Sequence, residues 1–359
     1  MSLPSLGPSL ADRLKAQIAA TGPLSVADYM AACLHDPLGG YYATRPALGA
    51  DGDFITAPLV SQMFGELLGL WAVQTWRQMG FPTPFVLAEA GPGDGTLMAD
   101  ILRAARIDPA FLAAADLWLV ETSPPLRAAQ NERLAGGPLQ PRWTGSLDGL
   151  PPEPLILIAN ELLDCIPARQ FVRTPQGWAE RRVGLSEAGE LAFGLMPIDQ
   201  TGLPDAAEGS LYEDCAAQAG FASALAARIA RDGGAALLID YGRDAPGFGD
   251  TLQALRAHKK VDPLKSPGKA DLTVHADFHA VLAAARAVGV EADLLTQGTL
   301  LRRLGIEPRA QALARARPDQ AQTVERQLRR LTRSDQMGDL FKAACIYSPG
   351  LKPPAFEVP

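Results

Sequence analysis

Four short apolar runs constrain the fold of this 359-residue chain most strongly. They are Phe85–Ala88, Leu117–Val120, Leu155–Ala159 and Ala235–Ile239, and polar or glycine residues follow each of them. Continuous apolar runs of about four to six residues are typical of strands that are buried on both faces. Helix-like sequence around residues 97–105 separates the first two runs. The pattern therefore predicts an α/β fold with a parallel, doubly wound sheet.

A glycine-rich segment directly follows the first run, at the sheet edge where ligands bind in such folds. It contains three glycines, Gly91, Gly93 and Gly95, and two acidic residues, Glu89 and Asp94. The glycines permit a tight turn and a close approach of a ligand to the backbone, although a purely structural turn would also use them. The acidic residues would repel a pyrophosphate, but they favour the ammonium and sulfonium groups of S-adenosylmethionine. The spacing also differs from the dinucleotide-binding pattern G-x-G-x-x-G.

An acidic residue, Glu121, ends the second run. A carboxylate at this place can accept hydrogen bonds from both ribose hydroxyls of an adenosine. Dinucleotide-binding folds also bind the ribose through an acidic residue at this place, so Glu121 by itself indicates an adenosine cofactor without identifying which one. The alternative is that Glu121 is an ordinary charged residue at a strand end. Together with the glycine-rich segment, it favours S-adenosylmethionine as the cofactor.

Asn160, Glu161 and Asp164 follow the third run and are the candidate catalytic residues. On a helix, Glu161 and Asp164 would share one face. Carboxylates can bind the N–H groups of a guanidinium in bidentate fashion, which suits arginine as a methyl acceptor. The alternative is structural: Asn160 caps a helix, and Glu161 lies favourably in its first turn. The segment also lacks the Pro-Pro-aromatic motif of enzymes that methylate amino groups of nucleic-acid bases.

Composition excludes several classes of function. The net charge of −7 argues against a nucleic-acid groove, which needs clustered basic residues. The four cysteines are scattered without a C-x-x-C pair, which suits a reducing compartment. No apolar run approaches the roughly 20 residues that span a bilayer, and the N-terminus has neither a signal peptide pattern nor a mitochondrial presequence pattern. We therefore expect a cytoplasmic protein without membrane insertion.

One short pattern, His275-x-Asp277-x-His279, superficially resembles the spacing of metal ligands. The chain has only four histidines, and no second cluster offers matching ligands. Because a closed metal site needs about four ligands, we expect no metal.

The remaining segments predict the domain organisation. Residues 1–80 have helical composition, with a capping-box-like start at Ser25 and an amphipathic stretch over residues 59–79, so we expect an N-terminal helical cap. Residues 81–359 then form the core. Two insertions are expected in the core: a hairpin lobe at about residues 170–215, and a polar cap loop at about residues 247–278. A loop as long as the second is more typical of a lid over a binding site than of a connection between two elements.

Several longer motifs resemble the MidA-like methyltransferases. They occupy residues 39–42, 52–58, 61–66, 89–95, 159–164, 238–242, 249–252, 270–278 and 337–342. The resemblance covers nearly the whole chain, and the block at residues 52–66 is specific to this family. The family includes a mitochondrial assembly factor of respiratory complex I that symmetrically dimethylates an arginine of a core subunit. One position departs from the pattern, because Leu59 stands where the family usually has a glutamate.

The resemblance implies a class I, Rossmann-like methyltransferase that depends on S-adenosylmethionine. It also implies that the acceptor is an arginine of a partner protein, a subunit of respiratory complex I, modified during assembly. It implies that Thr56 and Gln62 join the glycine-rich segment, Glu89 and Glu121 in the cofactor site. It also implies that Asp53, Asp250, His275 and Asp277 lie on the acceptor side. Two alternatives stay open: a small-molecule methyltransferase of the same fold, and a non-catalytic assembly factor. The sequence is compatible with a homodimer but does not predict one.

Overall fold

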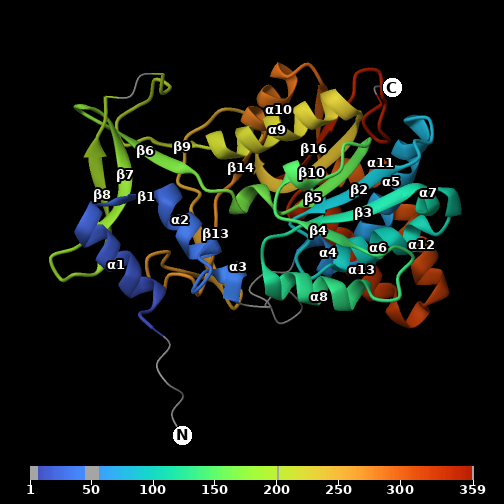
Figure 1. The fold of residues 1–359 in the computed structure, drawn as a ribbon, viewed down its shortest axis with the longest axis horizontal. Coiled ribbons are helices and arrows are strands. Elements are labelled where there is room, and N and C mark those ends of the chain that lie inside the picture. The colour runs from blue at the N-terminus through green and yellow to red at the C-terminus, as the bar shows by residue number, and fades with distance from the viewer. Residues whose placement is uncertain (1–6, 45–55, 200–201, 358–359) are drawn as a thin grey trace, which may run out of the picture.

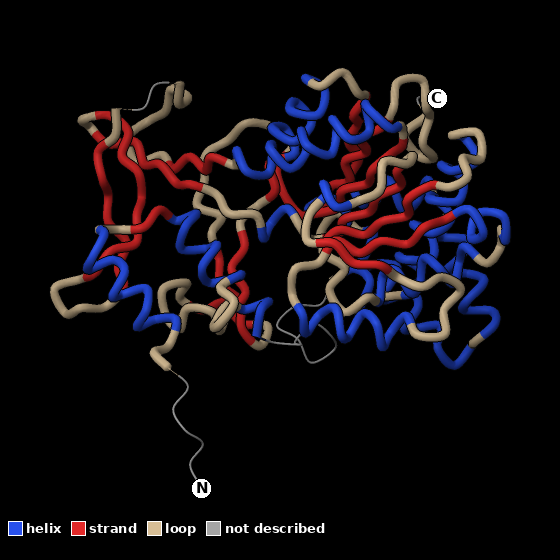
Figure 2. Tube along the Cα trace, viewed as in Figure 1, coloured by secondary structure: helices blue, strands red, loops and turns tan. Residues whose placement is uncertain are grey.

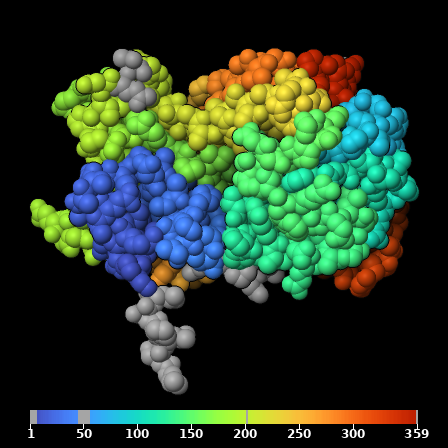
Figure 3. Space-filling model, viewed as in Figure 1, coloured from blue at the N-terminus to red at the C-terminus, as the bar shows by residue number. Residues whose placement is uncertain are grey.

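The computed structural model describes residues 7–44, 56–199 and 202–357. Figure 1 shows two lobes side by side, a larger one built on a central sheet and a smaller one that contains the first helices. The lobes meet where α3 (Tyr41–Thr44) lies against α8 (Pro124–Leu134), and Figure 3 shows the N-terminal residues in blue against the green and cyan surface of the larger lobe.

The central sheet follows the order β15-β16-β10-β5-β2-β3-β4, with β14 paired to β10. Its strands are β2 (Phe85–Ala90), β3 (Ala115–Val120), β4 (Arg142–Thr144), β5 (Leu155–Asn160), β10 (Gly234–Arg243), β14 (Ala276–Asp277), β15 (Glu291–Thr296) and β16 (Phe341–Tyr347). The strands pair in parallel except β16, which is antiparallel to β10 and β15. All four apolar runs are strands, so the predicted α/β sheet is confirmed.

Helices cover both faces of this sheet, as Figure 2 shows. One face packs against α5 (Gln62–Gln78), α6 (Thr96–Ala105), α7 (Pro109–Ala114), α11 (Gln297–Arg303), α12 (Ile306–Ala316) and α13 (Ala321–Thr332); the other packs against α9 (Ala216–Asp232) and α10 (Phe278–Ala287). Side chains alternate between the two cores along each strand: Phe85 and Leu87 enter one, and Val86 and Ala88 enter the other. A strand buried on both faces has to be apolar throughout, which explains the continuous runs.

The order of the strands creates a crevice between β2 and β5. From β2 the chain adds β3 and β4 on one side, and it then returns to add β5 and β10 on the other side. Ala90 of β2 pairs with Ala159 of β5, so the carboxyl ends of the two strands lie next to each other. In doubly wound sheets, this reversal is where ligands bind.

The smaller lobe combines three distant parts of the chain. Its elements are α1 (Leu10–Thr21), β1 (Leu24–Ser25), α2 (Val26–His35), β6 (Arg169–Thr174), β7 (Gly177–Leu185), β8 (Leu191–Pro197), β9 (Leu211–Asp214), β11 (Gln253–Arg256), β12 (Lys259–Val261) and β13 (Asp271–Thr273). Strands β6 and β7 form the hairpin expected near residue 170. Strand β1 pairs with β7 through Leu24 and Val183, which ties the N-terminal helices to this hairpin.

The structure divides the chain differently from the boundary expected at residue 80. Helices α1 and α2 belong to the smaller lobe, whereas α4 (Ala57–Val60) and α5 pack on the central sheet. Residues 1–80 therefore do not form one cap, because the two helical segments bury their apolar sides against different cores. The expected cap loop at residues 247–278 also differs, since it contains the three-stranded sheet of β11, β12 and β13. Short helical turns complete the fold: η1 (Leu147–Gly149), η2 (Leu163–Cys165), η3 (Pro318–Gln320) and α14 (Met337–Leu340).

The helices α5 and α6 approach closely at Gly69, and this contact predicts a stability effect. A Cβ atom at Gly69 would lie 2.7 Å from the carbonyl oxygen of Ile101 and 3.0 Å from the Cβ of Ala104. Gly69→Ala is therefore expected to lower the free energy of unfolding by about 1–3 kcal/mol in chemical denaturation. Gly220→Ala is the matched control in α9, where nothing lies within 4 Å, and it should be neutral or stabilise by about 0.5–1 kcal/mol. Equal losses in both variants would contradict the close approach.

Candidate active site

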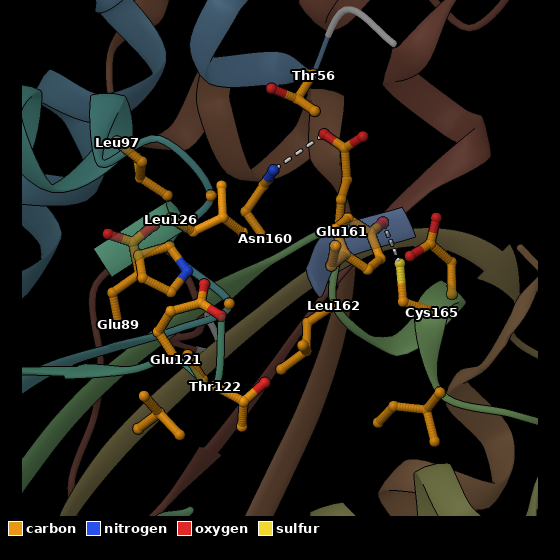
Figure 4. Close-up of a pocket in the computed structure, with 18 of the residues that line it drawn as sticks. Thr56, Glu89, Leu97, Glu121, Thr122, Leu126, Asn160, Glu161, Leu162 and Cys165 are labelled. Atoms are coloured by element: carbon orange, nitrogen blue, oxygen red, sulfur yellow. Dashed lines mark hydrogen bonds between the residues drawn. The ribbon is translucent and has the colours of Figure 1, made fainter. Parts of the chain in front are cut away.

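A cavity of about 520 Å³ lies over the carboxyl ends of β2, β3 and β5. The predicted site residues that line it are Thr56, Glu89, Gly91, Gly93, Asp94, Glu121, Asn160, Glu161 and Asp164. Figure 4 shows that the side chains of Thr56, Glu89, Glu121, Asn160 and Glu161 come from different segments and converge on one space, with Glu89 and Glu121 on one side and Glu161 on the other. The strand order thus brings together residues that are far apart in the sequence.

The glycine-rich segment forms a tight turn between β2 and α6. Its glycines have positive φ angles of 65° at Gly91, 54° at Gly93 and 82° at Gly95, a region that disfavours side chains. A Cβ atom at Gly91 would also lie 2.9 Å from a methyl carbon of Leu162. Gly95 is the N-cap of α6 and does not line the cavity, whereas Gly91 and Gly93 do. The turn therefore presents bare backbone to the cavity.

Glu89 is almost completely buried at the end of β2, with an exposed fraction of 2%. Burial raises the pKa of its carboxyl to about 8, and the neighbouring Asp94 adds to the effect, while a hydrogen bond from the Met98 backbone opposes it. Its Oε2 atom has no hydrogen-bond partner among the residues that the structure describes. A buried carboxylate oxygen without a partner fits a cationic ligand group, such as the ammonium of S-adenosylmethionine.

Glu121 lies directly after β3 and is held by two hydrogen bonds. The Ser123 backbone N–H donates to Oε1 at 2.7 Å, and the Gln130 amide donates to Oε2 at 3.2 Å. Burial raises the pKa of the carboxyl, and these hydrogen bonds oppose the shift. The carboxylate is thus fixed at the edge of the cavity, where it can accept further hydrogen bonds from ribose hydroxyls.

Gln130 is a residue that the sequence analysis missed. Its amide also donates to the Gly93 carbonyl at 2.8 Å, and the Trp143 indole N–H donates to its Oε1 at 2.8 Å. Gln130 therefore connects the glycine turn to Glu121 through hydrogen bonds from one side-chain amide. A signal was present in the sequence, because Gln130 interrupts the buried stripe of α8 between Leu126 and Leu134.

The rest of this half of the cavity is mostly apolar. Leu97, Leu126 and Leu147 line it, and Ser146 and Asp148 add polar groups from the segment after β4. None of these residues was singled out in the sequence. Apolar walls with a few polar groups suit an adenine ring. With Glu89, the glycine turn and Glu121, the residues present fit S-adenosylmethionine.

The candidate acceptor side centres on Glu161, a non-glycine residue with a positive φ of 53°. Such a conformation costs free energy in a residue that carries a side chain, and strained residues of this kind cluster at functional sites. The Oε1 atom accepts hydrogen bonds from the Asn160 amide at 2.9 Å and from the Ala57 backbone N–H at 3.1 Å. Figure 4 shows the carboxylate between Asn160 and Thr56. Burial raises the pKa of Glu161 to about 7, and the nearby Asp164 adds to this shift.

The helix expected at this segment is absent from the structure. Asn160 is the last residue of β5, and a short 3₁₀ turn, η2, begins only at Leu163. The shared helix face of Glu161 and Asp164 and the helix cap by Asn160 are therefore both corrected. A tight turn places the two carboxylates on the cavity instead. Asp164 is buried, and its Oδ1 atom has no hydrogen-bond partner within the described ranges.

Neighbouring elements hold this turn through four hydrogen bonds. Glu161 N–H donates to the Ile239 carbonyl at 2.8 Å, Asp164 N–H to Asp240 Oδ2 at 3.1 Å, the Gln218 amide to the Leu163 carbonyl at 2.9 Å, and Val274 N–H to the Asp164 carbonyl at 3.0 Å. Asp240 and Gln218 were missed as site residues. A sequence signal was present for Asp240, because it follows the fourth apolar run in the same way as Glu121 follows the second. No comparable sequence signal marked Gln218.

The smaller lobe closes one side of the cavity through Tyr42. Its hydroxyl donates to Asp271 Oδ1 at 2.9 Å and lies 2.9 Å from Cys165 Sγ. All three residues line the cavity. The contact joins α3 and β13 of the smaller lobe to η2, so the acceptor side lies where the lobes meet.

Several predicted residues lie away from the cavity. Gln62 is exposed at the start of α5, and Asp53 lies outside the described residues. Asp250 forms an ion pair with Arg181 at 2.7 Å in the smaller lobe. Asp250, His275 and Asp277, which the resemblance placed on the acceptor side, do not line the cavity, because their side chains serve other contacts.

His275 and Asp277 have structural surroundings. The His275 ring packs edge-on against Tyr241, with ring centroids 5.4 Å apart. Asp277 caps α10 and forms an ion pair with Arg243 at 2.6 Å. In the described ranges, no group of three or more His, Cys, Asp or Glu side chains is arranged to hold a metal ion. Across the same ranges, no helix has the length and apolar character needed to cross a membrane.

The position that departs from the family pattern bears directly on this site. Leu59 lines the cavity together with its neighbour Pro58 and with Thr56. Compared with the glutamate expected from the family resemblance, this chain presents an apolar side chain to the cavity. The substitution makes this wall of the cavity less acidic.

The buried carboxyls predict how stability depends on pH. The pKa values of Glu89 and Glu161 in the folded protein, about 8 and about 7, lie above the ordinary value of 4.5. The folded state therefore binds these protons more tightly than the unfolded state, so the stabilisation is complete below about pH 4.5 and is lost as pH rises through about 7 and 8. Without ligand, Tm should fall between about pH 5 and pH 9. A Tm that stays constant over this range would contradict the raised pKa values.

The chain is similar to several known proteins in sequence and in structure. The chain is 36% identical over 336 residues to the mitochondrial protein arginine methyltransferase NDUFAF7 of Danio rerio, covering 86% of this chain and 79% of that protein. It is 36% identical to the human protein of that name, covering 83% and 73%. A crystal structure from Burkholderia thailandensis, bound to S-adenosyl-homocysteine, matches with a TM-score of 0.83 and 30% identity, covering 96% of this chain and 95% of that one.

These relatives correct one expectation from the sequence. A cytoplasmic location was inferred from the absence of targeting patterns, but the relatives from Danio rerio, Drosophila melanogaster and Homo sapiens are all named as mitochondrial proteins. The expectation of a cytoplasmic protein is therefore wrong.

The match to a family model agrees with the fold and with the cofactor that the cavity fits. The model describes S-adenosyl-L-methionine-dependent methyltransferases and matches residues 67–296, which include the glycine turn, Glu121 and the Asn160–Asp164 segment. The expected class I, Rossmann-like fold is confirmed by the similar crystal structure. The chain therefore belongs to the MidA-like family of S-adenosylmethionine-dependent methyltransferases.

Proposed function

We propose that this methyltransferase modifies an arginine side chain of a partner protein. The observation that carries the proposal is Glu161, whose carboxylate is held at the cavity in a strained backbone conformation beside a second buried carboxylate, Asp164. A pair of carboxylates in a cavity is suited to a guanidinium, which they can bind through its N–H groups. The protein arginine methyltransferase activity named for the relatives supports the same acceptor.

The chain's own residues have separate roles in this proposal. When bound, S-adenosylmethionine supplies an electrophilic methyl group on its sulfonium. Glu89 would hold the ammonium group, Gly91 and Gly93 would contact the methionine end, and Glu121 would hold the ribose. Their positions along one side of the cavity leave the opposite side, with Glu161, for the acceptor.

The acceptor side has to orient the guanidinium and take up a proton. A guanidinium is cationic at neutral pH because its pKa lies above about 12. Glu161 Oε1 is already held by Asn160 and Ala57, so the carboxylate has a fixed direction. Asp164 Oδ1 and Asn160 Oδ1 lack partners among the described residues and can accept N–H groups. A pKa of about 7 suits Glu161 for accepting the proton that the guanidinium loses.

The resemblance to the MidA-like family extends the proposal to the partner. It supports a subunit of respiratory complex I as the protein that carries the arginine, modified during assembly. The location of the acceptor side between two lobes suits a protruding side chain of another protein, since Tyr42 and Asp271 from the smaller lobe line the same cavity as Glu161.

Methylation of matched peptides tests the proposed acceptor. Peptides that are identical except for arginine, lysine or glutamine at one position are incubated with the full chain and labelled S-adenosylmethionine, and the products are identified by mass spectrometry. We expect label only in the arginine peptide, as methylarginine. Transfer to the lysine peptide, transfer to small amines alone, or cofactor binding without transfer would each contradict the proposal. The last two outcomes correspond to a small-molecule methyltransferase and to a non-catalytic assembly factor.

A further inference from the structure

A positively charged segment stands out in an otherwise acidic chain. Residues 302–333 contain nine arginines and three acidic residues, although the whole chain carries a net charge of −7. The exposed arginines are Arg302, Arg303, Arg315, Arg317, Arg326, Arg329, Arg330 and Arg333. The segment includes α12 and α13, which Figure 1 shows in red-orange at the edge of the larger lobe. We call this segment the arginine arm.

Four arginines of the arm, Arg303, Arg315, Arg326 and Arg330, form no ion pair in the part of the chain that the structure describes, and of these only Arg326 and Arg330 lie on α13. Other arginines of the arm have acidic neighbours: Arg317 pairs with Asp319, Arg329 with Glu325, and Arg333 with Asp335. Arg326 and Arg330 do not, and they lie one helical turn apart on the exposed side of α13. Like charges at this spacing destabilise a helix. Arg326 donates a hydrogen bond to the Thr323 hydroxyl at 3.5 Å, which leaves the positive charges of both arginines without a carboxylate partner among the described residues.

The opposite side of α13 fixes the orientation of these two side chains. Val324, Leu328 and Leu331 recur at helical spacing and pack into the main core. Since they occupy one side of the helix, Arg326 and Arg330 project from the other side. Both arginines are exposed. The pair is therefore displayed to a partner by a helix whose rotation is set by packing.

Ion pairs to one buried carboxylate anchor the arm to the core. Arg309 of α12 binds Glu66 of α5 through two contacts, Nε to Oε2 at 2.8 Å and Nη2 to Oε1 at 3.1 Å. Arg103 of α6 contacts the same carboxylate at 3.3 Å. Glu66 is buried, with an exposed fraction of 8%. A two-point contact of this kind holds the arm in a fixed position relative to the cavity.

The arginine pair lies near the acceptor side of the cavity. Helix α13 packs against α4, and α4 contributes Pro58 and Leu59 to the cavity wall. The charge of Arg330 reaches Glu161: burial raises the pKa of Glu161 to about 7, Asp164 adds to this, and Arg330 opposes it. A polypeptide that places an arginine at Glu161 would thus pass close to Arg330.

We propose that Arg326 and Arg330 bind acidic side chains that flank the target arginine in the partner polypeptide. The inference rests on the proposed function and adds a preference of the same site for an acidic sequence context. Guanidinium groups bind carboxylates in bidentate fashion, and complementary charge speeds association and fixes register. The acidic remainder of the chain would repel such a segment, so this pair supplies the local attraction. An acidic peptide fits better than a nucleic acid, because the remaining acidic surface would oppose a long phosphate backbone.

The test measures how the residues that flank the target arginine affect methylation, in wild type and in a variant in which the charges of Arg326 and Arg330 are reversed. Peptides with one arginine flanked by glutamates, glutamines or lysines are methylated by wild type and by the double variant Arg326→Glu/Arg330→Glu. For wild type, kcat/KM should be about tenfold higher with glutamate than with glutamine flanks at low salt, and the ratio should shrink towards one at about 0.5 M salt. In the variant, the preference should reverse towards lysine flanks. The matched control, Arg106→Glu/Arg256→Glu, changes the same net charge at exposed sites elsewhere and should keep the wild-type preference.

The outcomes separate this inference from the proposed function. Equal kcat/KM for all three flanks in wild type, or an unchanged preference in the double variant, would overturn the inference while arginine methylation stands. If no arginine peptide is methylated, fluorescence anisotropy with a labelled glutamate-rich peptide tests docking directly. Salt-sensitive binding that the double variant loses would keep the docking site although the proposed function fails. Absence of such binding, or tighter binding to duplex DNA or to phosphatidylserine vesicles, would overturn it.

Discussion

Glu161→Gln is expected to lower kcat for arginine methylation by about 100-fold or more, because it removes the charge that orients the guanidinium and the group that accepts its proton. The substituted amide keeps the size of the side chain, and the hydrogen bond from Ala57 can still reach its oxygen. Cofactor binding should therefore change little. Single-turnover methylation of the arginine peptide, together with calorimetry of cofactor binding, separates the two effects.

The control for this variant is Glu187→Gln. Glu187 is exposed in the turn between β7 and β8, so its substitution changes the same charge away from the cavity and should leave kcat unchanged. If Glu161→Gln kept the wild-type kcat, the carboxylate would not act on the acceptor, and the proposed role of the Asn160–Asp164 segment would fail.

Glu89→Gln is expected to act in opposite directions on affinity and stability. Loss of the charge that fits the cofactor's ammonium should raise the Kd of S-adenosylmethionine by about 10- to 100-fold. The same change should raise Tm of the ligand-free protein at about pH 9, because the buried carboxyl has a pKa of about 8 and its ionised form is unfavourable there. At about pH 5 the wild-type carboxyl is already neutral, so Tm should differ little.

Glu132→Gln provides the matched comparison. Glu132 is exposed on α8, close to the cofactor side of the molecule but outside the cavity, and its substitution should change neither Kd nor Tm. An unchanged Kd in Glu89→Gln would show that this carboxylate does not hold the ammonium, whatever happens to Tm.

The central sheet could be predicted from local sequence because burial on both faces demands continuous apolar strands. Phe85–Ala90 and Leu155–Asn160 are buried at every position, and both runs are conspicuous in the sequence. The glycine turn was equally clear, since positive φ angles at Gly91, Gly93 and Gly95 require a distinctive spacing. Both features could be predicted because the sequence of each segment alone carries the pattern.

The smaller lobe could not be predicted in the same way, because it depends on pairing between distant segments. Strand β1 is only two residues long, and it exists through its contact with β7, about 160 residues further on. The helical patterns of α2 and α5 look alike in the sequence, although they pack against different lobes. Amphipathic periodicity shows that a helix buries one side, but it does not identify the partner.

The candidate site likewise contains residues that local sequence could predict and residues that depend on contacts between distant segments. Residues at or just after the carboxyl ends of strands, such as Glu89, Glu121 and Glu161, were found because the carboxyl ends of parallel strands meet at one edge of the sheet. Gln130 and Gln218 were missed, because their roles depend on hydrogen bonds to the backbone carbonyls of Gly93 and Leu163, which are distant in the sequence. The backbone strain at Glu161 was also invisible, since the sequence favoured a helix where the chain makes a tight turn.

Calorimetry with S-adenosylmethionine and S-adenosylhomocysteine, on wild type and on Glu121→Ala, tests whether this cavity is the cofactor site. Both ligands should bind wild type at one site per chain, and Glu121→Ala should weaken binding by about tenfold or more because the ribose hydroxyls lose their hydrogen-bond acceptor. Failure of wild type to bind either ligand, or equal affinity in the variant, would contradict the assignment of this cavity as the cofactor site.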